Sequence, residues 1–232
     1  MNEVQNVFME TPQGLKEPKY TVVDDSNGVY EVRDYEGYTV ASTVIEGYGS
    51  TSSSQETDLL EMGSAFNNLA SYLFGANEDK KSMAMTTPVA TTSLGEMRFY
   101  LDEQTGRIPS PNGSSQPEIQ IIEIPPARLA VRKFTGFVTD GEIARQKDTL
   151  LSALELDDVE LDVDHGAVVP HVIFQYNPPY TIPMVRRNEI AIPVRAVQAE
   201  GQTSLKQEWS VEDDEEEEYL IDDSGDDVSP SD

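Results

Sequence analysis

The chain has 232 residues, with 43 acidic residues against 16 basic ones, a formal charge of −27 and no cysteine. The missing cysteine excludes disulfides, thiolate nucleophiles, iron–sulfur clusters and cysteine zinc sites. The acidic balance argues against nonspecific nucleic-acid binding and against adsorption to anionic membranes, because both require a basic face.

The amino-terminal sequence has no recognisable targeting signal. Its first twenty residues lack the basic start and apolar stretch of a signal peptide, and their three acids are unlike a transit peptide. No apolar run approaches the roughly 20 residues that span a bilayer. We therefore expect a soluble intracellular protein, or a mature form whose targeting segment has been removed.

Short strands are predicted before the first helix. Residues 1–18 are expected to form a flexible arm, because two prolines and a glycine interrupt any periodicity. Turn signals at Asn27-Gly28 and Glu36-Gly37 then separate three predicted strands, at residues 20–23, 29–33 and 38–45.

A helix is predicted over residues 55–74. Its apolar residues recur at spacings of three and four, which places them on one helical face: Leu59, Met62, Phe66, Leu69 and Leu73. Gly75 is placed to cap the C-terminus. Strands are expected next at 83–91 and 96–101. Pro88 has no N–H for a ladder, so the first of these strands is predicted to lie at a sheet edge or at a bulge.

The second half of the chain repeats this order. Strands are predicted at 118–124 and 127–134, and Thr139-x-x-Glu142 is a capping box for a second helix. The apolar face of that helix comprises Ile143, Leu150, Leu151 and Leu154. Two more strands follow, at 168–176 and 188–197. Each half is thus strand–strand–helix–strand–strand, which predicts an α+β fold, with a mostly antiparallel sheet, curved or closed into a distorted barrel, and two helices against it.

The chain is predicted to divide into an arm over 1–18, a domain over 19–198 and an acidic tail over 199–232. Between residues 207 and 232 there are 13 acids and no basic residue. Such a charge block is typical of a disordered segment. Trp209 and Tyr219 interrupt the acids and are candidates for a short motif that docks a basic protein partner.

The sequence contains no constellation that indicates catalysis. His165 and His171 are its only histidines, and their spacing is not that of the helical H-E-x-x-H zinc motif. They are expected to be a turn and a strand residue, with a zinc or haem role as the alternative. Neither a G-x-S-x-G elbow nor a phosphate-cradling glycine loop is present. We therefore predict a non-enzymatic protein without a resident metal ion.

Methionines and arginines suggest a binding site instead. Met83 and Met85 are predicted to share one strand face, and thioethers suit planar, polarizable ligands. The loop YNPPYTIPMVRRNE, from Tyr176, adds Met184 and the pair Arg186-Arg187, whose guanidinium groups pair well with carboxylates. Ordinary core packing remains the alternative for the methionines. For the loop, the alternative is a structural hydrogen-bond knot of Arg186 with Asn188 and Glu189.

Four segments carry a resemblance to a known family: VYEVRDYEGYTVAST, FNNLASYLFGANEDKKSMAMTTPV, KFTGFVTDGEI and YNPPYTIPMVRRNEIAI. In this order, over roughly residues 19–197, the chain resembles the SOUL haem-binding protein family, with most likeness to its plant and algal plastid branch. The resemblance implies a distorted β-barrel with two flanking helices. It also implies reversible, non-covalent binding of haem or another porphyrin in an apolar groove, without catalysis, in the cytoplasm or a plastid.

The resemblance leaves the ligand contacts to be assigned on this chain. Asp34 stands where one animal branch has a proposed axial histidine, and Ser71 and Thr181-Ile182 stand where some relatives carry basic residues. The predicted groove is lined by Phe66, Leu69, Leu73, Met83, Met85, Tyr176, Met184, Arg186 and Arg187. The two arginines are the expected partners of the pigment's propionates. The alternative function is an interaction protein with a closed groove, whose acidic tail docks a basic partner.

Overall fold

The computed structural model describes residues 12, 14–26, 28–49, 55–103, 106–113, 117–164 and 166–195, with backbone alone at 26 and 55–59. The chain divides into two units, and every described residue belongs to the first, Met1–Val197. The predicted acidic tail and most of the predicted arm lie outside the described residues. Their predicted flexibility, and the docking motif around Trp209, stay predictions.

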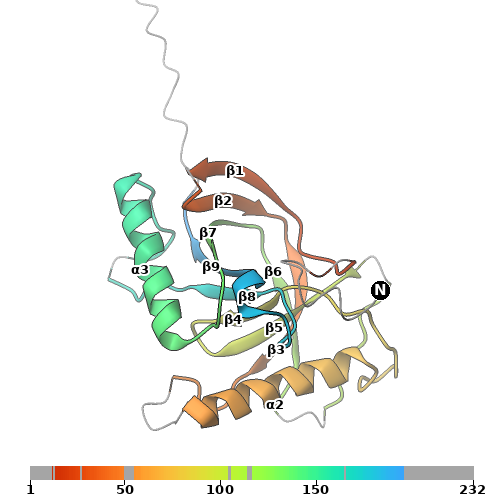
Figure 1. Cartoon of the computed structure of the whole chain (residues 1–232). Coiled ribbons are helices and arrows are strands. Elements are labelled where there is room, and N and C mark those ends of the chain that lie inside the picture. Colours follow the sequence, from red (N-terminus) through yellow and green to blue (C-terminus); the bar gives the residue numbers. More distant parts are fainter. Residues whose placement is uncertain are drawn as a thin grey trace, which may run out of the picture. The chain divides into compact units, whose positions relative to one another are not determined.

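The elements follow the chain in an order close to the predicted one. They are β1 (Tyr20–Ser26), β2 (Tyr30–Tyr35), β3 (Tyr38–Val44), α2 (Gln55–Leu73), β4 (Val89–Thr92), β5 (Glu96–Leu101), β6 (Gln120–Ile124), β7 (Ala127–Phe134), α3 (Asp140–Leu156), β8 (Val172–Gln175), the 3-10 helix η2 (Pro183–Val185) and β9 (Asn188–Pro193). Figure 1 shows the strands curling into a half-barrel, with both helices on its outside. The predicted α+β fold with a curved antiparallel sheet is confirmed.

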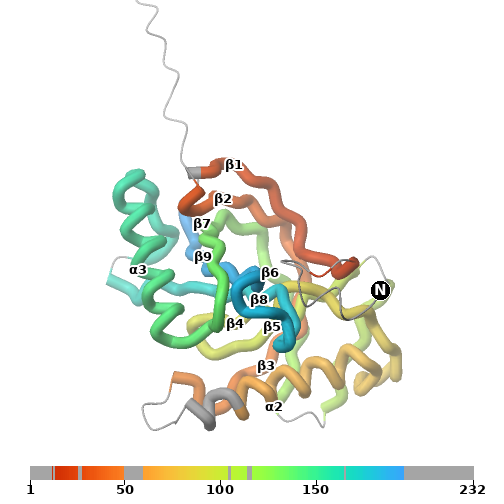
Figure 2. Tube along the Cα trace, in the orientation of Figure 1, coloured from red at the N-terminus to blue at the C-terminus, as the bar shows by residue number. Residues whose placement is uncertain are grey.

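The described strands form one nine-stranded sheet in the order β1-β2-β7-β9-β8-β4-β5-β3-β6. Without β1 this order is symmetric, because β2-β7-β9-β8 corresponds to β6-β3-β5-β4 read from the other edge. The first strand of each half therefore pairs with the second strand of the other half, as β2 with β7 and β6 with β3. β4 and β8, far apart in sequence, lie side by side where the halves meet (Figure 2).

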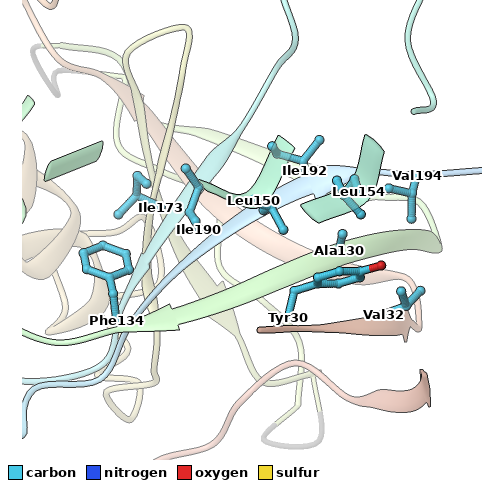
Figure 3. Close-up of a cluster of buried hydrophobic side chains, with 10 residues drawn as sticks. All are labelled: Tyr30, Val32, Ala130, Phe134, Leu150, Leu154, Ile173, Ile190, Ile192 and Val194. Carbon is cyan, nitrogen blue, oxygen red and sulfur yellow. The ribbon is translucent and has the colours of Figure 1, made fainter. Parts of the chain in front are cut away.

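Alternation along each strand sends side chains to two different faces of the sheet. In β7, Ala130 packs with Leu150 and Leu154 of α3 on the outer face, in the cluster that Figure 3 shows. Leu129 and Val131, its neighbours in sequence, join Phe174 on the inner face. The outer face has a second cluster under α2, which packs against β3 and β5. The inner face is covered by neither helix.

The end of α2 follows from its sequence. Gly75 has a φ of 116°, and the Ala76 and Gly75 N–H groups donate to the Ser71 and Tyr72 carbonyls. These two bonds define a Schellman motif, as the predicted cap requires. The buried face of the helix runs through Ala65, Leu69, Tyr72 and Leu73, while Phe66 lies at its margin. Tyr72 was not predicted on this face; its hydroxyl donates to the Pro109 carbonyl over 2.8 Å.

The start of α3 also agrees with its sequence, and it gives a first prediction. The Thr139 hydroxyl accepts a hydrogen bond from the Glu142 N–H, which is one of the two bonds of the predicted capping box, whereas the Glu142 carboxylate accepts from Arg145 and Gln146. Thr139→Ala is expected to lower the free energy of unfolding by about 1 kcal/mol, because an orphan N–H loses its partner. Urea unfolding followed by circular dichroism measures this change. Thr139→Ser, which keeps the hydroxyl, is the control; equal losses in both variants would contradict a capping role.

The structure around Pro88 differs from the strand predicted there. A strand was predicted over 83–91 at a sheet edge or a bulge, but β4 begins only at Val89 and pairs with β5 and β8 on its two sides. Pro88 precedes the strand, so the ladder needs no N–H from it. Before it, the Thr87 N–H donates to the Lys16 carbonyl instead. The predicted strands at 168–176 and 188–197 are likewise shorter, as β8 and β9.

Candidate functional site

The predicted groove residues on α2 and its following segment all associate with one buried cluster. Leu69 and Leu73 belong to that cluster together with Phe99. Met83 and Met85 are partly buried and pack against it from outside. The Phe66 side chain is 37% exposed, and its ring meets the Phe99 ring edge-on at 5.2 Å between centroids. We call the partly exposed residues Phe66, Met83 and Met85 the α2 surface.

Side chains fill the space between α2 and the segment that follows it. The cavity there, bounded by Leu73, Met83 and Leu101 among others, has a volume of only about 10 Å³. Sites that enclose a drug-sized ligand have volumes of roughly 300–1,000 Å³. The α2 surface therefore offers a ligand an apolar face to lie on rather than a preformed pocket.

The loop between β8 and β9 places its arginines in contacts within the chain. Arg186 donates to the carbonyls of Thr181 and Pro179, and its guanidinium carbon lies 5.0 Å from the Phe137 ring centroid. Arg187 is nearly buried: its Nε donates to Glu189 over 2.9 Å, and its guanidinium carbon lies 3.7 Å from the centroid of the Tyr176 ring. These contacts are of the kind expected from a structural knot.

The other loop residues are divided between the interior and the surface. Tyr176 is buried, whereas Met184 is 79% exposed. Asn188 donates its side-chain amide to the Gly136 carbonyl over 3.1 Å, which ties the loop to the segment before α3. Tyr176 belongs to the cluster on the inner face of the sheet, whereas the α2 surface packs on the cluster of the outer face, so the predicted groove residues form two groups.

The contacts of this loop converge on a buried ion pair that was not predicted from the sequence. Arg33 and Glu189 are fully buried and joined by two hydrogen bonds of 2.9 and 3.0 Å. The Tyr176 hydroxyl donates to the same carboxylate over 2.8 Å. Burial alone would raise the pKa of Glu189, but hydrogen bonds and charge from Arg33 and Arg187 outweigh it and hold that pKa below its usual value. No local pattern relates residues 156 positions apart.

The inner face of the sheet carries a second feature that the sequence did not indicate. Four aromatic rings from different strands lie there in succession, with centroid distances of 6.3 Å from Phe174 to Tyr35, 6.5 Å from Tyr35 to Tyr38 and 6.0 Å from Tyr38 to Tyr100. Burial raises the pKa of all three tyrosines. These rings border a hollow of about 110 Å³.

The structure describes one of the two histidines considered as metal ligands. His165 is outside the described residues, and burial lowers the pKa of His171, a half-buried residue just before β8. In the described ranges, no three acidic, histidine or cysteine residues cluster as a metal site would require. Asp34, at the position of the animal-branch histidine, pairs with Arg128 through two bonds of 2.6 and 2.7 Å. Among the described helices, none has the length and apolarity to cross a membrane.

Comparisons with known proteins give a family match and several distant structural likenesses. A family model described as SOUL heme-binding protein matches residues 15–193. No curated protein matches the chain. Among solved structures, the chain is similar to the EcmrR C-terminal domain, at 12% identity and a TM-score of 0.48, over 73% of this chain and 99% of that one. It is also similar to a hydrolase from Listeria innocua, at 10% identity and a TM-score of 0.46, over 72% and 91% of the two chains. Likeness at this level says nothing about activity.

Proposed function

Because the chain belongs to the SOUL heme-binding protein family, we propose that it binds a tetrapyrrole reversibly and acts as a non-catalytic carrier or buffer. The observation that supports this role is the α2 surface, where Phe66, Met83 and Met85 leave apolar atoms exposed above a buried cluster. A porphyrin is flat, apolar and polarizable over its faces, which suits contact with thioethers and an aromatic ring.

The residues present fit the face of a tetrapyrrole better than its periphery or its metal. Met83 and Met85 are half-buried, so little side-chain freedom is lost when a ligand covers them. We do not extend the proposal to Arg186 and Arg187 as propionate partners, because both guanidinium groups are engaged inside the chain. Binding through apolar contact alone predicts that iron-free protoporphyrin IX binds about as well as hemin.

The test replaces the thioethers by amides of similar length. We expect the double variant Met83→Gln/Met85→Gln to bind hemin and protoporphyrin IX at least about tenfold more weakly than the unmodified chain, since each 1.4 kcal/mol of lost contact is a factor of ten. Soret absorbance measures the binding of both pigments, and thermal unfolding shows whether the fold is intact.

Leu156→Gln is the matched control for this experiment. Leu156 is 85% exposed at the end of α3, so its replacement adds the same amide away from the α2 surface. Its affinity for both pigments should equal that of the unmodified chain. Saturable binding that is equally strong in the double variant would refute the α2 surface as the site. No saturable binding by the unmodified chain would refute tetrapyrrole binding itself.

One observation favours a second candidate, an interaction protein whose acidic tail docks a basic partner. The space beside α2 is almost filled, with only about 10 Å³ left. Deletion of residues 207–232 separates the two functions. For a tetrapyrrole carrier, the shortened chain binds hemin as the full chain does. If the protein is an interaction protein, neither the full chain nor the shortened chain binds hemin. Only the full chain then binds a lysine-rich peptide at physiological salt, because the deletion removes the 13 acidic residues of the tail.

A further inference from the structure

The hollow on the inner face of the sheet is a second candidate site, separate from the α2 surface. It is bordered by Tyr35 of β2, Tyr38 of β3, Tyr100 of β5 and Phe174 of β8. Pro18, in the segment before β1, also lines it, and that segment is held in place where the Glu36 N–H donates to the Lys19 carbonyl and Lys16 pairs with Asp102 at 2.8 Å. The hollow is therefore formed by backbone elements that are already fixed, as expected of a small-molecule site.

The size of the hollow limits what it can hold. A dry cavity of about 150 Å³ lined by apolar side chains accommodates benzene. The hollow here, with about 110 Å³ and an open side, thus suits a single aromatic ring and is far too small for a tetrapyrrole. The surrounding aromatic rings would meet such a ligand edge-on or offset, which are the favoured geometries.

The charge of the residues that line the hollow indicates which chemical group an aromatic ligand should carry. Among the described residues that line it, Arg98 of β5 is the only charged one, and none carries a carboxylate. The Arg98 Nη2 donates to Glu96 over 2.5 Å, and 24% of the side chain is exposed. A guanidinium has five N–H donors, so the accessible part of this side chain can also donate to a ligand carboxylate in a charge-assisted bond. A cationic ligand would instead meet the guanidinium charge.

We propose that this hollow binds a small monocyclic aromatic carboxylate, with its ring among the tyrosines and Phe174 and its carboxylate on the accessible part of the Arg98 guanidinium. The site is independent of tetrapyrrole binding, since the inner face is opposite the helices and the α2 surface. Phenylacetate is the probe, and benzyl alcohol is its uncharged analogue of similar size.

Isothermal titration of the full chain tests the proposal. Phenylacetate is expected to bind saturably, and at least about tenfold more tightly than benzyl alcohol, because only the carboxylate pairs with the guanidinium. Arg98→Met keeps the length of the side chain but removes its charge, so it should abolish the difference between the two probes. Arg107→Met, at an exposed arginine that does not line the hollow, should leave both affinities unchanged.

Two further measurements keep the result interpretable. Ala90→Leu adds bulk at a residue that lines the hollow and leaves Arg98 in place, so it should abolish phenylacetate binding without a change of charge. The hemin titration should be unaffected by Arg98→Met, which separates this site from the proposed tetrapyrrole site. The proposal is overturned if phenylacetate does not saturate, if Arg98→Met retains the preference for phenylacetate, or if benzyltrimethylammonium binds more tightly than phenylacetate.

Discussion

Arg33→Leu is expected to destabilise the fold by about 3–5 kcal/mol, because it leaves the Glu189 carboxylate buried without its main partner. Arg33 and Glu189 are both inaccessible to solvent and share two hydrogen bonds. Arg187 and the Tyr176 hydroxyl would still contact the carboxylate, but they cannot replace the bidentate pair. Urea unfolding followed by circular dichroism measures the loss.

Two comparisons show whether burial is the cause. The double variant Arg33→Met/Glu189→Met removes both charges and should recover most of the loss, since an apolar pair of similar volume avoids the desolvation cost. Arg128→Leu breaks the ion pair with Asp34, whose side chain is 42% exposed, and should cost no more than about 1 kcal/mol. Equal losses for Arg33→Leu and Arg128→Leu would contradict a special role for the buried pair.

Leu69→Ala is expected to cost about 3–5 kcal/mol, because it opens a cavity in the cluster under α2. Leu69 is 0% exposed and packs in that cluster with Leu73 and Phe99. The same measurement on Leu60→Ala is the control, since Leu60 is on the same helix and 68% exposed; its effect should lie within about 0.5 kcal/mol.

This variant also decides what Leu69 does for the ligand. A side chain without exposed surface cannot touch a bound tetrapyrrole, so hemin affinity measured well below the unfolding temperature should be unchanged by Leu69→Ala. The Met83→Gln/Met85→Gln variant should show the opposite pattern, with weaker hemin binding and a small change in stability. If Leu69→Ala weakened hemin binding and left stability intact, α2 would open to receive the ligand, contrary to the packing of this cluster.

The arrangement of the sheet explains why two separate binding features are possible. Both helices lie on the outer face, so the clusters around Leu150 and Leu69 account for most of the packing there. In the described part of the chain, the inner face is filled by side chains from the strands and from the connecting segments that contain Pro18, Pro88, Pro125 and Tyr176. Because the sheet curls around this face, aromatic residues from strands far apart in sequence come within ring contact of one another.

Local patterns in the sequence determined most of the elements. The three-and-four spacing of apolar residues predicted α2 and α3, Gly75 and Thr139 marked a helix end and a helix start, and the bounds of β5 and β7 were predicted to the residue. The order of two similar halves was predicted as well. These features depend on contacts between residues a few positions apart, which leave a periodic trace in the sequence.

Only the tertiary structure decided how the halves combine and what lies between them. The exchange of β2 and β6 between the halves and the interior place of β4 depend on strand pairings across the whole chain. The same holds for the pair Arg33–Glu189 and for the hollow around Arg98. Each of these features joins residues that are distant in sequence. The alternation of apolar and polar residues along a strand indicates which residues share a face, but it does not indicate which strand will pair with it.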